Sequence, residues 1–122
     1  GSSAVPQDWL EVINEYGGKI PETYGVPVKE VCEGIKHGVR KVNIDTDLRL
    51  AATGAMRRFL HNNPSEFDPR KYNKEAMAAM RDICIARYES FGTSGNADKI
   101  TVISLEDMAK SYSRNEYEPK IR

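Results

Sequence analysis

Two short polar segments of this chain could bind an anion. The first is Gly1-Ser2-Ser3, and the second is the sequence Asn-Ile-Asp-Thr-Asp at residues 43–47. Small residues let a phosphate approach the backbone closely. The unpaired N–H groups at a helix N-terminus also favour an anion, because the helix dipole adds positive potential there. Together the two segments could form a phosphate site where a strand ends and a helix begins.

The same residues also have a purely structural interpretation. Ser, Thr, Asn and Asp are the preferred residues at helix N-caps, so Thr46 or Asp47 is expected to cap the helix that follows. Asp45 and Asp47 would repel a phosphate unless their side chains point away and only their N–H groups face the ligand. The residues alone therefore leave both a helix cap and a phosphate site open.

The segments that must position these residues are mostly helical. Apolar residues at helical spacing predict five helices, and these cover residues 7–16, 26–37, 46–62, 69–91 and 105–114. Asp68 and Pro69 are expected at the start of the fourth helix, and Ser104 with Asp107 resembles a capping box before the fifth. Residues 39–44, rich in β-branched side chains, predict one brief buried strand. A single strand cannot form a sheet, so the chain is either a mostly helical domain or part of an α/β protein whose other strands lie elsewhere.

Composition excludes several functional classes. The 122 residues are enough for one domain, and 39% hydrophobic with 30% charged residues indicates a soluble globular protein. The 18 basic and 18 acidic residues give a net charge of +0, which offers no reason to expect nucleic acid or a membrane surface as a partner. No apolar run approaches the roughly 20 residues that span a bilayer, and the first ten residues lack the pattern of a signal peptide.

The cysteines and histidines give no metal-site pattern. Cys32 and Cys84 lack the C-x-x-C spacing of redox and thiolate-zinc motifs, so two buried free thiols are expected, which suits a reducing, cytoplasmic compartment. His37 and His61 fall near predicted helix ends, where a surface position is expected.

Four stretches of the chain carry a resemblance to a known family. They are GSSAVP (1–6), YGVPVKEVCEGIKHGVRKVNIDTDLRLAATGAMRRFL (24–60), NPSEFDPRKY (63–72) and ARYESFGTSGNADKI (86–100). They resemble the C-terminal portion of class II, metal-dependent fructose-1,6-bisphosphate aldolase, in the bacterial subtype associated with the Calvin cycle. The run GIKHGVRKVNIDTDLR at 34–49 is highly specific to that family.

The resemblance implies an α/β fold in which this chain is the C-terminal part of a (β/α)₈ TIM barrel. Residues 39–44 would be the last strand, accompanied by helices 7 and 8 and by C-terminal helices. Residues 1–122 would be the C-terminal segment of a single barrel domain, beginning just past strand 7, with residues 92–122 as a C-terminal extension. A complete barrel needs roughly 250 residues, so its other strands would be supplied by the N-terminal portion of the same enzyme.

The resemblance also implies a reaction. The family reversibly cleaves fructose 1,6-bisphosphate to dihydroxyacetone phosphate and glyceraldehyde 3-phosphate, in glycolysis, gluconeogenesis and the Calvin cycle. It uses a divalent metal, usually zinc, as a Lewis acid. The metal ligands and the proton-transfer aspartate lie upstream in the family, so no metal ligand is expected in this chain. The chain alone is expected to be an inactive part of a cytoplasmic homo-oligomer, a dimer or larger.

Site residues follow from matching the family's motifs. The family's glycine-serine loop binds the phosphate of dihydroxyacetone phosphate and helps to hold a monovalent cation. In the Asn-x-Asp-Thr segment, the Asn contacts substrate near the reacting carbon, and the Asp-Thr end contacts phosphate. The expected catalytic residue is therefore Asn43. The expected substrate-binding residues are Gly1, Ser2, Ser3, Asn43, Ile44, Asp45 and Thr46.

Two further expectations stay open. Arg87, in the run ARYESF, is a candidate for a family arginine that reaches across a subunit interface to the second phosphate, with a structural arginine as the alternative. The alternative function for the whole chain is a non-catalytic helical fragment or interaction module that lacks the metal site.

Overall fold

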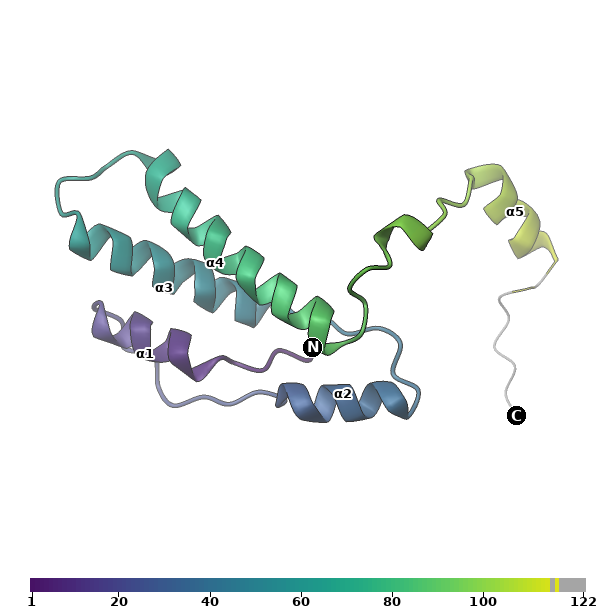
Figure 1. The fold of residues 1–122 in the computed structure, drawn as a ribbon, viewed down its shortest axis with the longest axis horizontal. Helices are drawn as coiled ribbons and strands as arrows, with labels where there is room; N and C mark the ends of the chain where they lie inside the picture. Colours follow the sequence, from purple (N-terminus) through teal and green to yellow (C-terminus); the bar gives the residue numbers. More distant parts are fainter. Residues whose placement is uncertain (115, 117–122) are drawn as a thin grey trace.

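The computed structural model describes residues 1–114 and residue 116, and its regular elements are helices (Figure 1). In chain order they are α1 (Gln7–Glu15), α2 (Val28–Lys36), α3 (Thr46–Asn62), α4 (Pro69–Ser90), the short 3₁₀ helix η1 (Ala97–Lys99) and α5 (Leu105–Ser113). The five predicted α-helices are confirmed, with ends that differ by one or two residues. The end of the expected C-terminal extension, residues 115 and 117–122, lies outside the described residues.

The core lies where α3 packs against α4 on one side and α1 on the other (Figure 1). Ala51 and Ala55 of α3 meet Ala79 of α4, and all three are buried. Such small side chains set a short distance between the helix axes. Trp9 of α1 packs against both this alanine cluster and a second one, which consists of Val5, Leu10, Ile13 and Leu50. The two clusters fix the N-terminal segment and α1 against α3.

The predicted caps of α4 and α5 are confirmed. The Asp68 carboxylate accepts the Arg70 N–H at 2.9 Å, and Pro69 occupies the first turn, where its missing N–H costs nothing. The Ser104 hydroxyl accepts the Asp107 N–H at 3.1 Å. These local cap signals could be recognised in the sequence because both partners lie within three residues of each other.

The predicted strand at residues 39–44 is wrong for this structure, and no residue from 1 to 114 is in a strand. A strand requires N–H and C=O partners on a neighbouring strand. Here the segment runs as irregular backbone between α2 and α3, although the Ser2 N–H still donates to the Asn43 carbonyl at 2.7 Å. The helical part of the predicted barrel segment is present, whereas the sheet is not.

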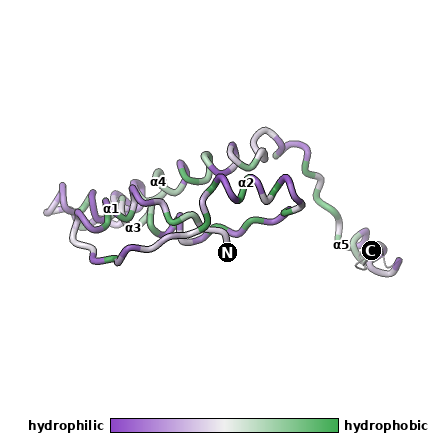
Figure 2. Tube along the Cα trace, turned by 90° about the horizontal axis from the view of Figure 1, so that it is seen from below, coloured by the Kyte–Doolittle hydropathy of each residue, from purple (hydrophilic) through white to green (hydrophobic). Residues whose placement is uncertain are grey.

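Residues after α4 extend away from the helical body (Figure 1). The stretch directly before α5 is mostly hydrophobic (Figure 2). Large side chains are exposed there and at the first residue of α5, with Val102 at 90% and Leu105 at 91%. The two cysteines are free and half-buried, rather than fully buried as expected. None of the described helices combines the length and the apolar character needed to cross a membrane.

Candidate functional site

The two polar segments of the sequence meet in the structure. The Ser2 N–H donates to the Asn43 carbonyl at 2.7 Å. The Ser3 hydroxyl oxygen accepts the N–H groups of Asp45 and Thr46, each at 3.1 Å. Ser3 therefore caps α3 from a position 42 residues earlier in the chain. The expected caps were wrong: Asp45 occupies the N-cap position without accepting a backbone N–H of the helix on its side chain, and α3 begins at Thr46.

An open hollow of about 530 Å³ lies between these segments. Of the substrate-binding residues expected from the sequence, all except Ser2 line it. The lining consists of Gly1, Ser3, Val42, Asn43, Ile44, Asp45 and Thr46. The structure thus gathers at one place the residues that the sequence assigned to one site.

Residues 41–45 have two faces, although they form no strand. Lys41, Asn43 and Asp45 are exposed, whereas Val42 and Ile44 are half-buried. We call the first set the polar face and the second the apolar face. The Lys41 ammonium donates to Asn43 Oδ1 at 2.5 Å, so a positive charge lies beside the expected catalytic amide. Lys41 was not among the expected site residues, although its position two residues before Asn43 already placed both on one side of an extended chain.

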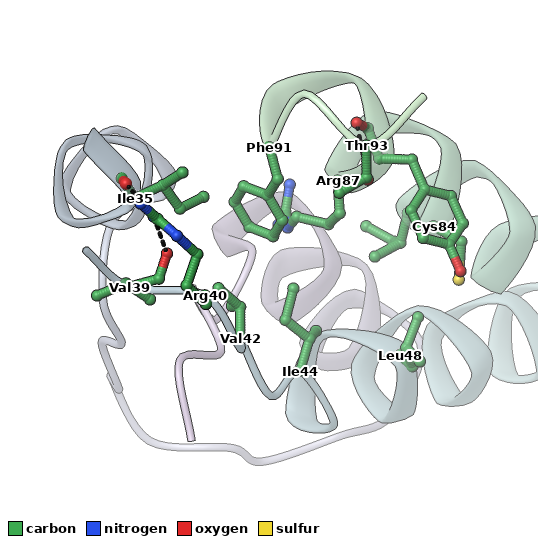
Figure 3. Close-up of a pocket in the computed structure, with 12 residues that line it drawn as sticks. Ile35, Val39, Arg40, Val42, Ile44, Leu48, Cys84, Arg87, Phe91 and Thr93 are labelled. Carbon is green, nitrogen blue, oxygen red and sulfur yellow. Dashed lines mark hydrogen bonds between the residues drawn. The ribbon is translucent and has the colours of Figure 1, made fainter. Parts of the chain in front are cut away.

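The apolar face turns toward α4 (Figure 3). Val42 and Ile44 border a groove of about 470 Å³ together with Ile83 and Phe91. Arg40, at the same groove, donates from Nη1 to the carbonyl oxygens of Ile35 and Val39 at 2.9 and 3.0 Å, which fixes the chain where it leaves α2 (Figure 3).

Two aspartates lie at the start of α3, and each is paired with an arginine. Asp45 bonds Arg49 at 2.8 Å, and both side chains are mostly exposed. Asp47 bonds Arg87 of α4 at 3.0 Å; the Asp47 side chain is 0% exposed and that of Arg87 is 15% exposed. The negative charges of Asp45 and Asp47, which were expected to repel a phosphate, are therefore each offset by a paired arginine. The contact of Arg87 with Asp47 also gives Arg87 the structural role that the sequence analysis held as the alternative.

Backbone contacts hold the first five residues in place. The Val26 N–H donates to the Ser3 carbonyl at 3.0 Å. Gly25 lies so close that a Cβ there would come within 2.1 Å of the same Ser3 oxygen. At the other end of the segment, the Val5 N–H donates to Asp47 Oδ1 at 2.9 Å.

Most of the groups with shifted pKa values lie elsewhere, in the loop before α4 and in the first turn of α4. Hydrogen bonding to the Lys71 ammonium lowers the pKa of Glu66, and hydrogen bonding to the Arg70 guanidinium lowers the pKa of Asp68. The Glu66 carboxylate in turn raises the pKa of Lys71. These pairs hold the α3–α4 connection and do not face the hollow.

The donor set for a metal is not found in the described part of the chain. Residues 1–114 and 116 contain no group of three or more His, Cys, Asp or Glu side chains placed to hold a metal ion. The hollow itself offers hydroxyl, amide and backbone groups, which are suited to an anion.

Comparison with known proteins identifies relatives of the chain. The model of the class-II fructose-bisphosphate aldolase family matches residues 1–96. A fructose-bisphosphate aldolase of Pseudomonas aeruginosa is 73% identical over 121 residues, covering 99% of this chain and 34% of that protein. One from Stutzerimonas stutzeri is 72% identical over 121 residues, with the same coverage. One from Nostoc sp. is 59% identical over 116 residues, covering 95% of this chain and 32% of that protein. The chain spans about a third of the length of these curated relatives.

Proposed function

Because the chain belongs to the class-II fructose-bisphosphate aldolase family, we propose that it is the C-terminal part of a (β/α)₈ enzyme that reversibly cleaves fructose 1,6-bisphosphate. The products are dihydroxyacetone phosphate and glyceraldehyde 3-phosphate. In this proposal the chain supplies phosphate-binding segments to a cytoplasmic enzyme of the Calvin-cycle subtype. Its partners are the N-terminal portion of the same enzyme and further copies of the subunit.

The hydrogen bonding of Ser3 is the observation that carries the proposal. A hydroxyl group has one proton to donate and two acceptor positions. Ser3 Oγ uses its acceptor capacity for the N–H groups of Asp45 and Thr46. Its proton is then left for an acceptor on the open side, where the hollow lies. A phosphate oxygen there would accept from Ser3 and would lie at the positive end of the α3 dipole.

Asn43 is the residue of this chain that we propose to act at the reacting carbon. Its side chain lies on the polar face, and its backbone carbonyl is fixed by Ser2. An amide held in this way can orient a substrate oxygen with little reorganisation. The divalent metal, proposed as zinc, supplies Lewis-acid polarisation of the substrate carbonyl when bound. The metal ligands and the proton-transfer acid are both proposed to lie outside this chain.

A non-catalytic helical module is the second candidate, and the wholly helical secondary structure of the described residues favours it. The exposure of large apolar side chains argues against a self-contained module. Tyr88 on α4 and Val102 and Leu105 near α5 are each more than half exposed. An independent domain buries most such surface, whereas part of a larger enzyme covers it with the remainder of the protein.

The proposed function is tested by assaying the complete enzyme and this chain separately. We expect metal-dependent cleavage of fructose 1,6-bisphosphate by the complete enzyme, abolished by a chelator and restored by zinc. The isolated chain should show no turnover. Ser3→Ala in the complete enzyme should raise KM about tenfold, because it removes a hydrogen bond to a charged group. Turnover by the isolated chain, or a silent Ser3→Ala change, would contradict the proposal.

A further inference from the structure

We infer that Arg87 is a positioning residue for the phosphate-binding segment, acting through Asp47 and Val5. The inference rests on the proposed function, because it concerns the same hollow. Arg87 does not line that hollow and borders the apolar groove on the other side of residues 41–45 (Figure 3). Its effect on a ligand must therefore be transmitted through other residues.

Asp47 connects three parts of the chain. One carboxylate oxygen accepts the Val5 N–H at 2.9 Å, and the other accepts from Arg87 Nη2 at 3.0 Å. Asp47 itself belongs to the first turn of α3, directly after the segment that lines the hollow. A fully buried carboxylate is stable only when its charge is paired and its oxygens are hydrogen-bonded. Arg87 provides the paired charge and so permits Asp47 to hold Val5.

Val5 has a backbone conformation that needs such support. Its φ is 56°, in the left-handed region that β-branched residues rarely adopt, and its side chain is buried. Strain of this kind persists only where surrounding contacts enforce it, and it gathers at functional sites. Because Ser3 lies two residues before Val5, the hydrogen bond that Val5 donates to Asp47 fixes the turn that places the Ser3 hydroxyl against α3.

Arg87 also acts on the charge of this region. Asp47 lies at the same helix end as the N–H groups that Ser3 accepts, where an unpaired carboxylate would oppose an anionic ligand. The other charged groups nearby are Asp45, Arg49 and Lys41, and the first two already pair with each other. Loss of Arg87 would therefore leave one uncompensated negative charge beside the proposed phosphate position.

Arg87→Met and Arg87→Lys in the complete enzyme test this inference. The matched control is Arg81→Met on the same helix, which removes an exposed arginine that reaches only Asp82 at 4.0 Å. The measurements are KM for fructose 1,6-bisphosphate, the inhibition constant of inorganic phosphate, kcat, and hydrogen exchange of the amides of residues 3–5.

For Arg87→Met we expect both KM and the phosphate inhibition constant to rise about tenfold, equivalent to the loss of about one hydrogen bond. The change in kcat should be smaller, and amide exchange of residues 3–5 should be faster. Arg87→Lys should recover most of the phosphate affinity, because it restores a positive partner for Asp47. Arg81→Met should match the wild-type enzyme in all four measurements.

An Arg87→Met enzyme that is folded and has an unchanged phosphate inhibition constant would overturn the inference. If Arg87→Met does not fold, Asp47→Asn carries the test. It removes the charge pair with Arg87 and leaves Val5 only a neutral amide oxygen, a weaker acceptor than a carboxylate, so the amides at residues 3–5 should exchange faster. Ser3→Ala in the same assay separates the two proposals. If Ser3→Ala raises the phosphate inhibition constant and the Arg87 and Asp47 variants leave it unchanged, only the positioning role is rejected. If Ser3→Ala also leaves it unchanged, the proposed function is rejected.

Discussion

Asp45 and Asp47 are two residues apart at the start of one helix, and the structure gives them opposite environments. Asp45 is exposed beside the hollow and pairs with Arg49 from the next turn of its own helix. Asp47 is fully buried and pairs with Arg87, 40 residues later in the chain. The comparison shows that burial and the origin of the partner, rather than residue type, decide which carboxylate is structural. It also separates a side of residues 41–47 that faces the hollow from an interior side.

The largest predicted difference between the two aspartates is in stability. Asp47→Ala removes the partner of a largely buried guanidinium, and we expect a loss of about 3–5 kcal/mol in the free energy of unfolding. Asp45→Ala, the matched change, should cost less than about 1 kcal/mol, because exposed ion pairs contribute little. Urea unfolding of the complete enzyme checks both. Equal losses at the two positions would remove the distinction between the two sides.

The largest effect on catalysis, unlike that on stability, is expected from a substitution on the exposed polar face. Asn43→Ala in the complete enzyme should lower kcat about 100-fold, as expected for a group that contacts substrate more strongly in the transition state. KM should change much less. Steady-state kinetics on fructose 1,6-bisphosphate measure both. An Asn43→Ala enzyme with normal kcat and a raised KM would assign Asn43 to ground-state binding instead.

Gly25→Ala tests the placement of the N-terminal segment without touching a proposed ligand group. The new Cβ would come within 2.1 Å of the Ser3 carbonyl oxygen, so the segment must move away from residue 25. We expect phosphate to inhibit about tenfold more weakly, equivalent to about 1.4 kcal/mol. Gly38→Ala is a suitable control, because a Cβ at that position meets no atom within 4 Å, although its φ of 107° adds local strain. Similar inhibition constants for the two variants would contradict the described packing.

The smallest predicted effect concerns acid stability at the loop before α4. Glu66 and Asp68 have lowered pKa values in the folded chain, so their pairs stabilise it fully above the ordinary values of 4.5 and 3.8. This contribution is lost as the pH falls below those values and the carboxylates become protonated. Glu66→Gln should therefore lower Tm at pH 6 and converge with the wild-type enzyme toward pH 3. A constant Tm difference across that range would rule out the ion pair as the cause.

Helix positions and their local caps could be predicted from the sequence because their signals lie within a few residues. Asp68 with Arg70 and Ser104 with Asp107 are examples of such local signals. The cap of α3 was mispredicted because the acceptor is Ser3, far away in sequence. The role of Asp47 was missed for the same reason. Strand 39–44 was mispredicted because β-branched residues indicate a strand but cannot supply its neighbour.

Chemistry alone left it open whether the two polar segments form one site, and the resemblance to the aldolase family favoured that interpretation before the structure did. Gly1-Ser2-Ser3 and residues 43–46 carry no spacing rule that links them, and chemistry alone left a loop and a helix cap open. Their contact depends on the packing of α1 against α3, a long-range feature that composition does not determine. The position of Lys41 on the same side as Asn43 could have been predicted from the alternation of polar and apolar residues at 41–45.

The central claim is that the hollow beside the polar face of residues 41–45 binds phosphate, while the buried pair of Asp47 and Arg87 holds this region in place. A crystal structure of the complete enzyme with inorganic phosphate tests it most directly. We predict a phosphate within hydrogen-bonding distance of the Ser3 hydroxyl and Thr46, with Arg87 still bonded to Asp47. A phosphate bound to Arg87 in place of Asp47, or one bound elsewhere with the hollow empty, would contradict the account.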